Sequence, residues 1–385
     1  MRVLIAPDGF GGTLSPAEAA GAIAAGWAAA APHDDLDLAP QSDGGPGFIE
    51  VLATALPGAI RRAVRVEDPS ARPVEAEILL DGTTAYVESA QACGLHLLRD
   101  HERSPTTTTT YGVGQLLTAA LDAGATRIVV GLGGSATNDG GAGMLAALGV
   151  ARYDAGGERL APGGAALAGL ARLEGRPDPR LADVELIAAT DVDSPLLGLR
   201  GASAIFGPQK GASRDDVLLL DGALTRWADV LEAHLGVAFR DEPGAGAAGG
   251  LGAALLALGA RREPGIALVQ QLVGLPTRVA RAELVVTGEG TLDGSSLVGK
   301  VVSGVAALAA AEAVVCLVLA GAVRVGRREL GAAGIEAAYS LVEQVGVEAA
   351  LLRPAQELAA LTTRVARQWS GSGRATVEES GTPPC

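Results

Sequence analysis

The glycine-rich stretch at residues 131–143, GLGGSATNDGGAG, constrains the fold of this 385-residue chain more than any other feature. It follows the apolar run RIVV at residues 127–130, whose β-branched side chains are typical of a buried strand, and an apolar segment with helix-forming residues comes after it. The sequence therefore predicts a turn between a strand and a helix. Glycines in such a turn let backbone N–H groups approach a ligand closely, and the helix N-terminus behind them favours an anion. The turn is a candidate site for a phosphate or a carboxylate.

The glycine and polar residues of this stretch are the candidate anion ligands. They are Gly133, Gly134, Ser135, Thr137, Asn138 and Asp139. Hydroxyl and amide groups can donate hydrogen bonds, and the carboxylate can accept one or help to bind a metal ion. A glycine-rich loop with a helix cap and no ligand is the alternative interpretation.

Part of the stretch also fits the dinucleotide-binding fingerprint GxGxxA. Gly131, Gly133 and Ala136 occupy the fingerprint positions, and Asp154 lies close to the required distance downstream. The pattern is short, however, and the continuation ATNDGG is not part of it. We therefore favour phosphate or carboxylate binding over a dinucleotide site.

Length and composition limit the classes of protein to which the chain can belong. With 385 residues, the chain exceeds the usual size of one hydrophobic core, so we expect two domains. A net charge of -14 disfavours nucleic acid as a partner, because its phosphates would be repelled. No uncharged stretch reaches the length of a membrane span, and Cys93, Cys316 and Cys385 show no CxxC spacing. We expect a cytoplasmic protein without disulfides, structural zinc or membrane contact, and both a monomer and a homo-oligomer remain open.

Strand and helix signals alternate along the chain, and carboxylates follow several predicted strands. The predicted strands with this feature are residues 2–6, 36–40, 186–190 and 283–287. The carboxylates that follow them are Asp8, Asp43, Asp191 and Glu289, with Asp293 further along the last turn. Open α/β sheets bind ligands at the carboxyl ends of their strands, so these side chains are candidate site residues. For each of them, a carboxylate that caps a turn or a helix is the alternative.

Two lysines lie in glycine-containing turns and could bind phosphate. Lys210 lies in the segment IFGPQKGAS, ahead of a predicted helix at residues 214–235, where a charge and backbone N–H groups can act together. Lys300 ends a segment that nearly satisfies the phosphate-loop pattern, GxxxxGK followed by Ser or Thr. The pattern fails at Val301, which has no hydroxyl for Mg²⁺. Lys300 is a candidate phosphate ligand outside a standard phosphate loop.

Three local signals concern the rest of the fold. Asp81 and Gly82 form a two-residue hairpin signal between alternating apolar segments, which indicates a change of domain. Residues 347–369 have the pattern of one long amphipathic helix. Residues 370–385 form a polar tail with proline and glycine, which we expect to be disordered.

The turns together suggest phosphoryl transfer. This reaction needs positioned phosphates, a divalent cation, a carboxylate near the acceptor hydroxyl, and positive charge around the transferred group. The glycine turns, the carboxylates at the strand ends and the two lysines could supply these parts. The four histidines fall outside the glycine turns, and neither a nucleophilic cysteine nor a Ser–His pair is visible.

Several long motifs resemble those of the bacterial glycerate kinases of the glycerate 2-kinase type. They are GLGGSATNDGGAGML, IFGPQKGA, PGAGAAGGLGAAL and TGEGTLDGSSLVGK, with APD near the N-terminus and DGG at residues 43–45. The resemblance extends in order from residue 1 to about residue 365. It implies phosphorylation of D-glycerate that depends on ATP and Mg²⁺, with 2-phosphoglycerate as the expected product.

The resemblance also implies an α/β fold of two domains with the active site in the cleft between them. A flavodoxin-like (Rossmann-like) domain is expected from residues 1–75 and 285–369, with a second α/β domain inserted at residues 76–284.

Each candidate residue then has an expected role. The predicted catalytic residues are Asp191, Lys210, Glu289 and Asp293, and the predicted metal ligands are Asp191 and Glu289. The loop at residues 133–139, together with Lys210 and Lys300, is expected to hold the phosphates of ATP. Asp8, Asp43 and Gly44 are expected to line the acceptor side.

The chain departs from the family pattern at several positions. Gly9 and Gly11 replace a serine and a lysine, Pro46 and Phe48 replace a glutamate and a threonine, Thr291 replaces an arginine, and Val302 replaces a proline. Loss of a charge-assisted hydrogen bond to an anion costs about 1.5 to 3 kcal/mol. We favour an active kinase whose acceptor or kinetics have changed, including a kinase for another small hydroxy acid. The alternative is a catalytically weak paralogue that binds a nucleotide or an organic acid as a regulator.

Overall fold

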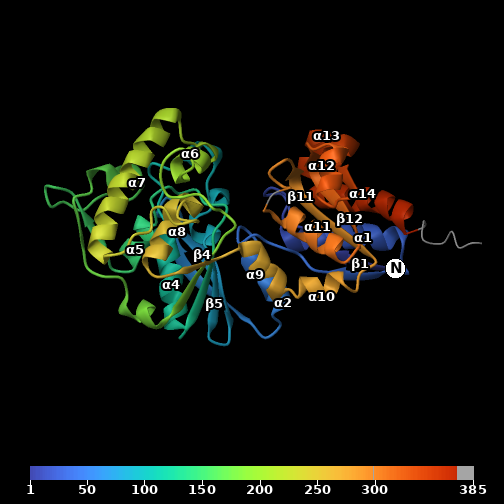
Figure 1. Cartoon of the computed structure of the whole chain (residues 1–385), viewed down its shortest axis with the longest axis horizontal. Helices are drawn as coiled ribbons and strands as arrows, with labels where there is room; N and C mark the ends of the chain where they lie inside the picture. Colours follow the sequence, from blue (N-terminus) through green and yellow to red (C-terminus); the bar gives the residue numbers. More distant parts are fainter. Residues whose placement is uncertain (298, 371–385) are drawn as a thin grey trace, which may run out of the picture. The chain divides into compact units, whose positions relative to one another are not determined.

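The structure, a computed structural model, describes residues 1–297 and 299–370. The chain divides into two compact units (Figure 1). Unit 1 combines residues 1–40 with the chain from residue 274 onward, and unit 2 comprises residues 41–273. Each unit is built around its own main β-sheet, with α-helices packed against it.

Unit 1 contains a five-stranded parallel sheet in the order β13-β12-β11-β1-β2. Its strands are β1 (Arg2–Ile5), β2 (Asp35–Leu38), β11 (Leu284–Leu292), β12 (Val315–Val323) and β13 (Ala337–Ser340). The first two strands come from one end of the chain and the other three from the opposite end, so blue and orange-red segments lie side by side in Figure 1. This order is that of a flavodoxin-like fold, which confirms the predicted fold of this domain.

The helices of unit 1 are α1 (Pro16–Ala30), α10 (Leu275–Val279), α11 (Val301–Ala311), α12 (Arg327–Ala332), α13 (Leu341–Leu352) and α14 (Pro354–Trp369). α1 begins with the capping box that its sequence indicates: the Ser15 hydroxyl accepts from the Glu18 N–H, and the Glu18 carboxylate accepts from the Ser15 N–H. α1 and α14 pack against each other, and the Thr363 hydroxyl donates to the carbonyl of Gly26 at 2.9 Å. Apolar residues of α1, α13 and α14 form one core with the sheet.

The C-terminal helical region consists of two helices rather than the single helix predicted at residues 347–369. α13 ends at Leu352, and α14 begins at Pro354. Proline has no backbone N–H to donate, and its ring clashes with the preceding turn, so a helix does not continue through this position. The first position of a helix suits proline well, and Pro354 therefore starts a new helix.

Unit 2 contains a six-stranded sheet in the order β10-β9-β6-β5-β4-β3 and a separate pair, β7 and β8. The strands are β3 (Ile60–Glu67), β4 (Pro73–Asp81), β5 (Thr84–Glu88), β6 (Arg127–Gly131), β7 (Ala151–Tyr153), β8 (Arg172–Glu174), β9 (Glu185–Ala189) and β10 (Arg261–Glu263). β5, β6, β9 and β10 are parallel, whereas β3 and β4 add an antiparallel edge. The predicted hairpin is confirmed, because Asp81 pairs with Thr84 across the turn at Gly82.

The helices of unit 2 are α2 (Phe48–Ala55), α3 (Ala90–Cys93), α4 (Tyr111–Asp122), α5 (Ala142–Ala147), α6 (Ala202–Phe206), α7 (Arg214–Leu235), α8 (Ala247–Ala257) and α9 (Gly265–Leu272). Residues of α4, α5, α7 and α8 form an apolar core with one face of the sheet. Ile128 and Val130 of β6 belong to this core, and their spacing of two residues is that of a strand with one face against it.

The boundaries of the units differ from the predicted domain boundaries. Residues 41–75, expected in the flavodoxin-like domain, belong to unit 2, because β3 pairs with β4 along its whole length. Residues 274–284, expected in the inserted domain, belong to unit 1, where α10 packs against α11.

Three further findings concern membrane-spanning helices, the C-terminal tail and the cysteines. None of the helices in the described part of the chain is long and apolar enough to span a membrane. The tail predicted to be disordered, residues 370–385, lies outside the described residues except for Ser370. Cys93 and Cys316 are free and buried, and burial raises the pKa of each thiol to about 12, which disfavours the reactive thiolate.

Candidate active site

Three loops of unit 2 meet at the carboxyl ends of β6 and β9. Gly131 and Ala189 are the last residues of these parallel neighbours and pair in register. A methyl group on Gly131 would lie 2.5 Å from the carbonyl oxygen of Gly44, so the loop at residues 43–45 crosses directly over the strand end. Only glycine permits this approach, which explains its presence at position 131. The DGG turn and the start of the long glycine stretch therefore belong to one site.

Asp43 and Asp191 are the carboxylates of this site. Gly265, at the start of α9, lies between them: an added methyl group would be 2.2 Å from the Asp43 carbonyl and 3.3 Å from Oδ2 of Asp191. Oδ2 of Asp191 accepts a hydrogen bond from the Ile266 N–H at 3.0 Å, and Oδ1 of Asp43 accepts one from the Gly45 N–H at 2.9 Å. Backbone donors thus fix both carboxylates beside the glycine turns.

The electrostatic environment of Asp191 is unusual for an aspartate. Burial, the largest cause, and the negative charge of Asp43 raise the pKa of its carboxyl to about 6, whereas the hydrogen bond from Ile266 opposes the shift. Strong perturbation by burial and a neighbouring carboxylate is a feature of functional sites.

Glu88 is a third carboxylate at this edge, and sequence reasoning missed it. It ends β5 and pairs in register with Gly131. Only 4 % of the residue is exposed, and burial raises the pKa of its carboxyl to about 7. Oε2 accepts from the Ile49 N–H at 3.1 Å, at the beginning of α2. Glu88 therefore holds the helix that follows the DGG turn. The rule that selected Asp191, a carboxylate at a strand end, also fits Glu88.

The polar side chains of the long glycine stretch lie inside unit 2. Asp139 is fully buried and accepts hydrogen bonds from the backbone N–H groups of Thr110, Gly141 and Gly143 at 2.9 to 3.1 Å. The buried Asn138 amide donates to the Ser203 hydroxyl at 2.9 Å. These contacts organise the turn from within.

Gly133 and Gly134 form the exposed part of the stretch. Gly133 is half-buried and Gly134 is exposed, whereas Ser135, Thr137, Asn138 and Asp139 are buried. The backbone at these two glycines is thus the part of the stretch that solvent reaches.

Lys210 contacts the same turn from the interior of unit 2. Its ammonium group donates to the Ser135 hydroxyl at 2.9 Å and to the Thr137 carbonyl at 2.7 Å. The side chain is 2 % exposed, and burial lowers its pKa to about 8. In this arrangement Lys210 fixes the loop and does not reach solvent.

The second glycine concentration, residues 243–251, also packs against this turn. The Gly140 N–H donates to the Gly249 carbonyl at 3.0 Å, and a methyl group on Gly249 would lie 1.9 Å from the Thr137 carbonyl oxygen. Glycine is needed here for close packing of two backbone segments.

Unit 1 carries the remaining predicted residues at the carboxyl ends of β1 and β11. The Asp8 N–H donates to the Gly288 carbonyl at 2.8 Å, and Oδ1 of Asp8 accepts from the Gly9 N–H at 2.7 Å. Glu289 lies on the adjacent strand, β11, and is 8 % exposed. The sheet order reverses between these two strands, which is where flavodoxin-like folds bind ligands.

Asp293 and Lys300 belong to the loop that follows. Oδ1 of Asp293 accepts from both the backbone N–H and the hydroxyl of Ser295, at 2.9 and 2.6 Å, and these bonds lower the pKa of its carboxyl. The Lys300 ammonium donates to the same hydroxyl at 2.9 Å. The two charged groups therefore share Ser295 as a partner.

The predicted residues fall into three groups. The sheet edge of unit 2 carries Asp43, Gly44, Gly133, Gly134 and Asp191; the interior of unit 2 holds Ser135, Thr137, Asn138, Asp139 and Lys210; and unit 1 carries Asp8, Glu289, Asp293 and Lys300. The two predicted metal ligands, Asp191 and Glu289, thus belong to different units. Among the described residues, the structure brings no three His, Cys, Asp or Glu side chains together as a metal-binding group.

A flavodoxin-like unit with an inserted α/β unit, each with glycine turns and carboxylates at the carboxyl ends of its parallel strands, defines a class of two-domain α/β enzyme. The sequence profile of the glycerate kinase family matches residues 3–370. The chain belongs to the glycerate kinase family, and it is accordingly a kinase, a transferase of phosphoryl groups.

Relatives and a solved structure agree with this family. The chain is 42% identical over 350 residues to the glycerate 2-kinase of Escherichia coli K12, a match that covers 90% of this chain and 92% of the relative. It is 45% identical over 346 residues to the glycerate kinase of Bacillus subtilis 168, covering 89% and 90%. A crystal structure described as a candidate glycerate kinase 2 of Salmonella typhimurium LT2 is similar with a TM-score of 0.77 at 39% identity, covering 97% of this chain and 99% of that one.

Proposed function

We propose that the protein transfers the γ-phosphoryl group of ATP to the 2-hydroxyl of D-glycerate, giving 2-phosphoglycerate and ADP. The names of its relatives support the acceptor, because they include glycerate kinases and a glycerate 2-kinase at 42 to 45% identity. The observation that carries the proposal is the meeting of Asp43, Gly44, Gly131 and Asp191 at one sheet edge of unit 2.

We assign the roles at this edge by chemistry. The exposed backbone at Gly133 and Gly134 can donate to phosphate oxygens, since glycine lets an anion approach the main chain. Asp191 orients the acceptor hydroxyl and accepts its proton, because a carboxyl with a pKa of about 6 is ionised at neutral pH yet basic for an aspartate. Asp43 lines the acceptor side. Lys210 acts as a positioning residue through Ser135 and Thr137.

The residues of this edge also fit Mg²⁺. This ion is usually bound by one or two carboxylates, with water and substrate phosphates completing its shell. Asp43 and Asp191 offer such a pair, and the lack of a larger ligand cluster among the described residues agrees with an ion that arrives with the nucleotide. When bound, Mg²⁺ would neutralise charge on the phosphates.

For unit 1 we propose that Asp8 contacts the acceptor, that Glu289 and Asp293 act on the acceptor or the metal ion, and that Lys300 binds phosphate. The two positions at which family cations are lost, Gly11 and Thr291, lie in neighbouring segments, because Thr291 belongs to β11 and a methyl group on the preceding Gly290 would lie 2.8 Å from the Gly11 N. This shared loss of positive charge favours a second candidate function, a kinase for a small hydroxy acid other than D-glycerate.

A coupled assay of ADP release tests both functions. The purified protein is given ATP and Mg²⁺ with D-glycerate, L-glycerate, glycolate, lactate or tartronate, and the product is identified by ¹H and ³¹P NMR. We expect the highest kcat/KM with D-glycerate and a phosphate on carbon 2. A phosphate on carbon 3 would contradict the assigned product, and preference for another acid would establish the second function. No turnover of any acceptor, with measurable ATP binding, would favour the regulatory paralogue.

A further inference from the structure

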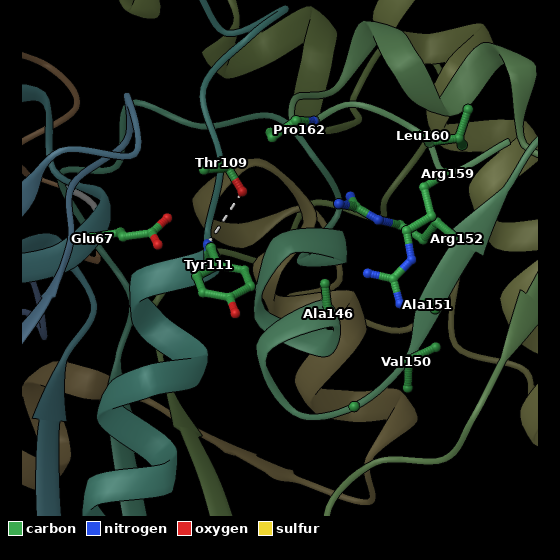
Figure 2. Close-up of a pocket in the computed structure, with 11 residues that line it drawn as sticks. Glu67, Thr109, Tyr111, Ala146, Val150, Ala151, Arg152, Arg159, Leu160 and Pro162 are labelled. Carbon is green, nitrogen blue, oxygen red and sulfur yellow. Dashed lines mark hydrogen bonds between the residues drawn. The ribbon is translucent and has the colours of Figure 1, made fainter.

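A pocket lined by apolar side chains and two arginines lies in unit 2, away from the carboxylates described above. Its volume is about 370 Å³, and its lining includes Thr109, Tyr111, Ala146, Arg152 and Arg159. Figure 2 shows the guanidinium groups of both arginines directed into the same space, with the side chains of Tyr111 and Ala146 on its other side. Arg152 comes from β7 and Arg159 from the loop after it. The pocket shares no residue with the edge formed by Asp43, Gly131 and Asp191.

Arg152 has an unusual environment for an arginine. It is 8 % exposed, and its Nη1 is buried without a hydrogen-bond partner. Within the described chain, Arg152 makes no ion pair within 4.0 Å. Burial lowers the pKa of the guanidinium group, and only the more distant charge of Asp139 opposes this effect. A buried guanidinium normally has a partner, because leaving a charge without one is costly.

The buried charges near this pocket do not balance. Asp139 is fully buried and interacts electrostatically with two buried cations, Lys210 and Arg152. One buried carboxylate therefore faces two buried positive groups. The exposed Arg159, whose guanidinium lies over the Tyr153 ring and also interacts with the negative charge of Glu174, adds a third positive group at the rim. Glu67 also lines the pocket, but Figure 2 shows its carboxylate on the far side of Tyr111 from the guanidinium groups. An anion between the two arginines would restore the balance.

We propose that this pocket is a binding site for a small anion, a carboxylate or a phosphate group, held between Arg152 and Arg159. The Nη1 donor of Arg152 is the central contact, since guanidinium groups bind carboxylates and phosphates through paired N–H donors. Glu67 at the other side disfavours a second negative group there, so the ligand carries one acid group and an uncharged or hydrogen-bond-donating remainder.

The pocket is physically connected to the glycine stretch. Thr109 lines the pocket, and its hydroxyl accepts from the Tyr111 N–H at 3.3 Å and donates to Oδ2 of Asp139 at 3.5 Å. Asp139 in turn holds the backbone of Gly141 and Gly143. An anion that orders Arg152 and Thr109 therefore acts on the part of the glycine stretch that Asp139 holds, at Gly141 and Gly143.

Calorimetric titration of the full-length protein with inorganic phosphate and, separately, with acetate tests this site. The variants are Arg152→Met, which keeps the buried volume, and Arg159→Gln, which changes an exposed side chain. Arg172→Gln is the matched control, because Arg172 lies on β8 beside β7, is exposed and does not line the pocket. Urea unfolding of each variant checks its fold.

We expect phosphate or acetate to bind the wild type, and Arg152→Met to weaken binding about tenfold or more, the effect of losing one charge-assisted hydrogen bond. Arg159→Gln should weaken binding severalfold, and Arg172→Gln should bind as the wild type does. The probe that binds more tightly identifies the acid group. No binding of either probe to the wild type, or equal affinity in the wild type and Arg152→Met, would overturn the proposal and leave Arg152 as a counter-charge for Asp139. If Arg152→Met does not fold, equal affinity in the wild type and Arg159→Gln overturns it.

Discussion

The substitution Gly131→Ala tests whether the close approach of the DGG turn to the end of β6 sustains catalysis. The added methyl group would lie 2.5 Å from the Gly44 carbonyl oxygen and 2.9 Å from Cδ1 of Phe48. Ordinary contacts of this kind begin at 3.4 Å, so the DGG turn and the end of β6 must separate by about 0.9 Å. Both the backbone of Gly44 and the buried ring of Phe48 oppose that movement.

The expected size of the effect follows from this displacement. Overpacking of this kind costs about 1 to 3 kcal/mol of stability. A shift near 1 Å in a catalytic constellation lowers the rate by about 10²-fold. We therefore expect Gly131→Ala to fold, to unfold at a lower urea concentration, and to lose about two orders of magnitude in kcat/KM with D-glycerate.

Gly222→Ala is the matched control. Gly222 lies within α7, where a methyl group would meet nothing within 4 Å. The same substitution should raise stability by about 0.5 to 1 kcal/mol, because alanine favours a helix interior, and should leave the rate unchanged. Full activity and unchanged stability in Gly131→Ala would show that the DGG turn and the end of β6 are not in contact.

Three further predictions concern ionisable groups of unit 2. Because the carboxylate form of Asp191 is the active one and its pKa is raised to about 6, kcat/KM should fall as the pH drops below about 6, and a flat profile from pH 5 to 8 would contradict this role. Asp43→Asn removes a negative charge that raises the pKa of Asp191. The activity that remains in this variant should therefore begin to fall at a lower pH than in the wild type, and an unchanged pH dependence would show that the two carboxylates do not interact. Burial raises the pKa of Glu88 from 4.5 to about 7, so the folded protein binds this proton more tightly than the unfolded chain, and the free energy of unfolding should decrease as the pH rises across that range. Glu88→Gln should reduce that decrease by up to about 3 kcal/mol between pH 5 and 8 in urea unfolding, and an identical pH dependence in the variant would exclude Glu88 as its source.

Sequence reasoning identified the carboxylates at strand ends because parallel strands place their carboxyl ends along one edge. Asp43 and Asp191 lie 148 positions apart (191 minus 43), yet their turns meet at β6 and β9. The segment that ends at Glu88 alternates like a hairpin strand, and this pattern does not indicate that Glu88 lies at the carboxyl end of a parallel strand. β5 is indeed a hairpin strand, but its other edge pairs in parallel with β6, and a strand pattern does not reveal both partners.

The polar residues of the glycine stretch show a different limit. A loop that binds phosphate and a loop that satisfies its own backbone use the same residue types, since both need short side chains with donors and acceptors. Asp139 and Asn138 are buried against Thr110 and Ser203, which lie far away in the sequence. Likewise, only the three-dimensional structure shows that the buried Lys210 ammonium donates a hydrogen bond to the Ser135 hydroxyl. The helix break at Pro354, by contrast, can be predicted from the sequence, because proline does not continue a helix.

The most direct test of the catalytic role of Asp191 is the rate of Asp191→Asn with D-glycerate and ATP, beside the control Asp193→Asn. Asp193 is two positions further along the same loop, and its side chain is 71% exposed and paired with Arg262. We predict that Asp191→Asn folds like the wild type and loses at least about 10² to 10⁴ in kcat, the usual contribution of a positioned acid or base, while Asp193→Asn retains most of its activity. A folded Asp191→Asn enzyme with a rate near that of the wild type would contradict this prediction.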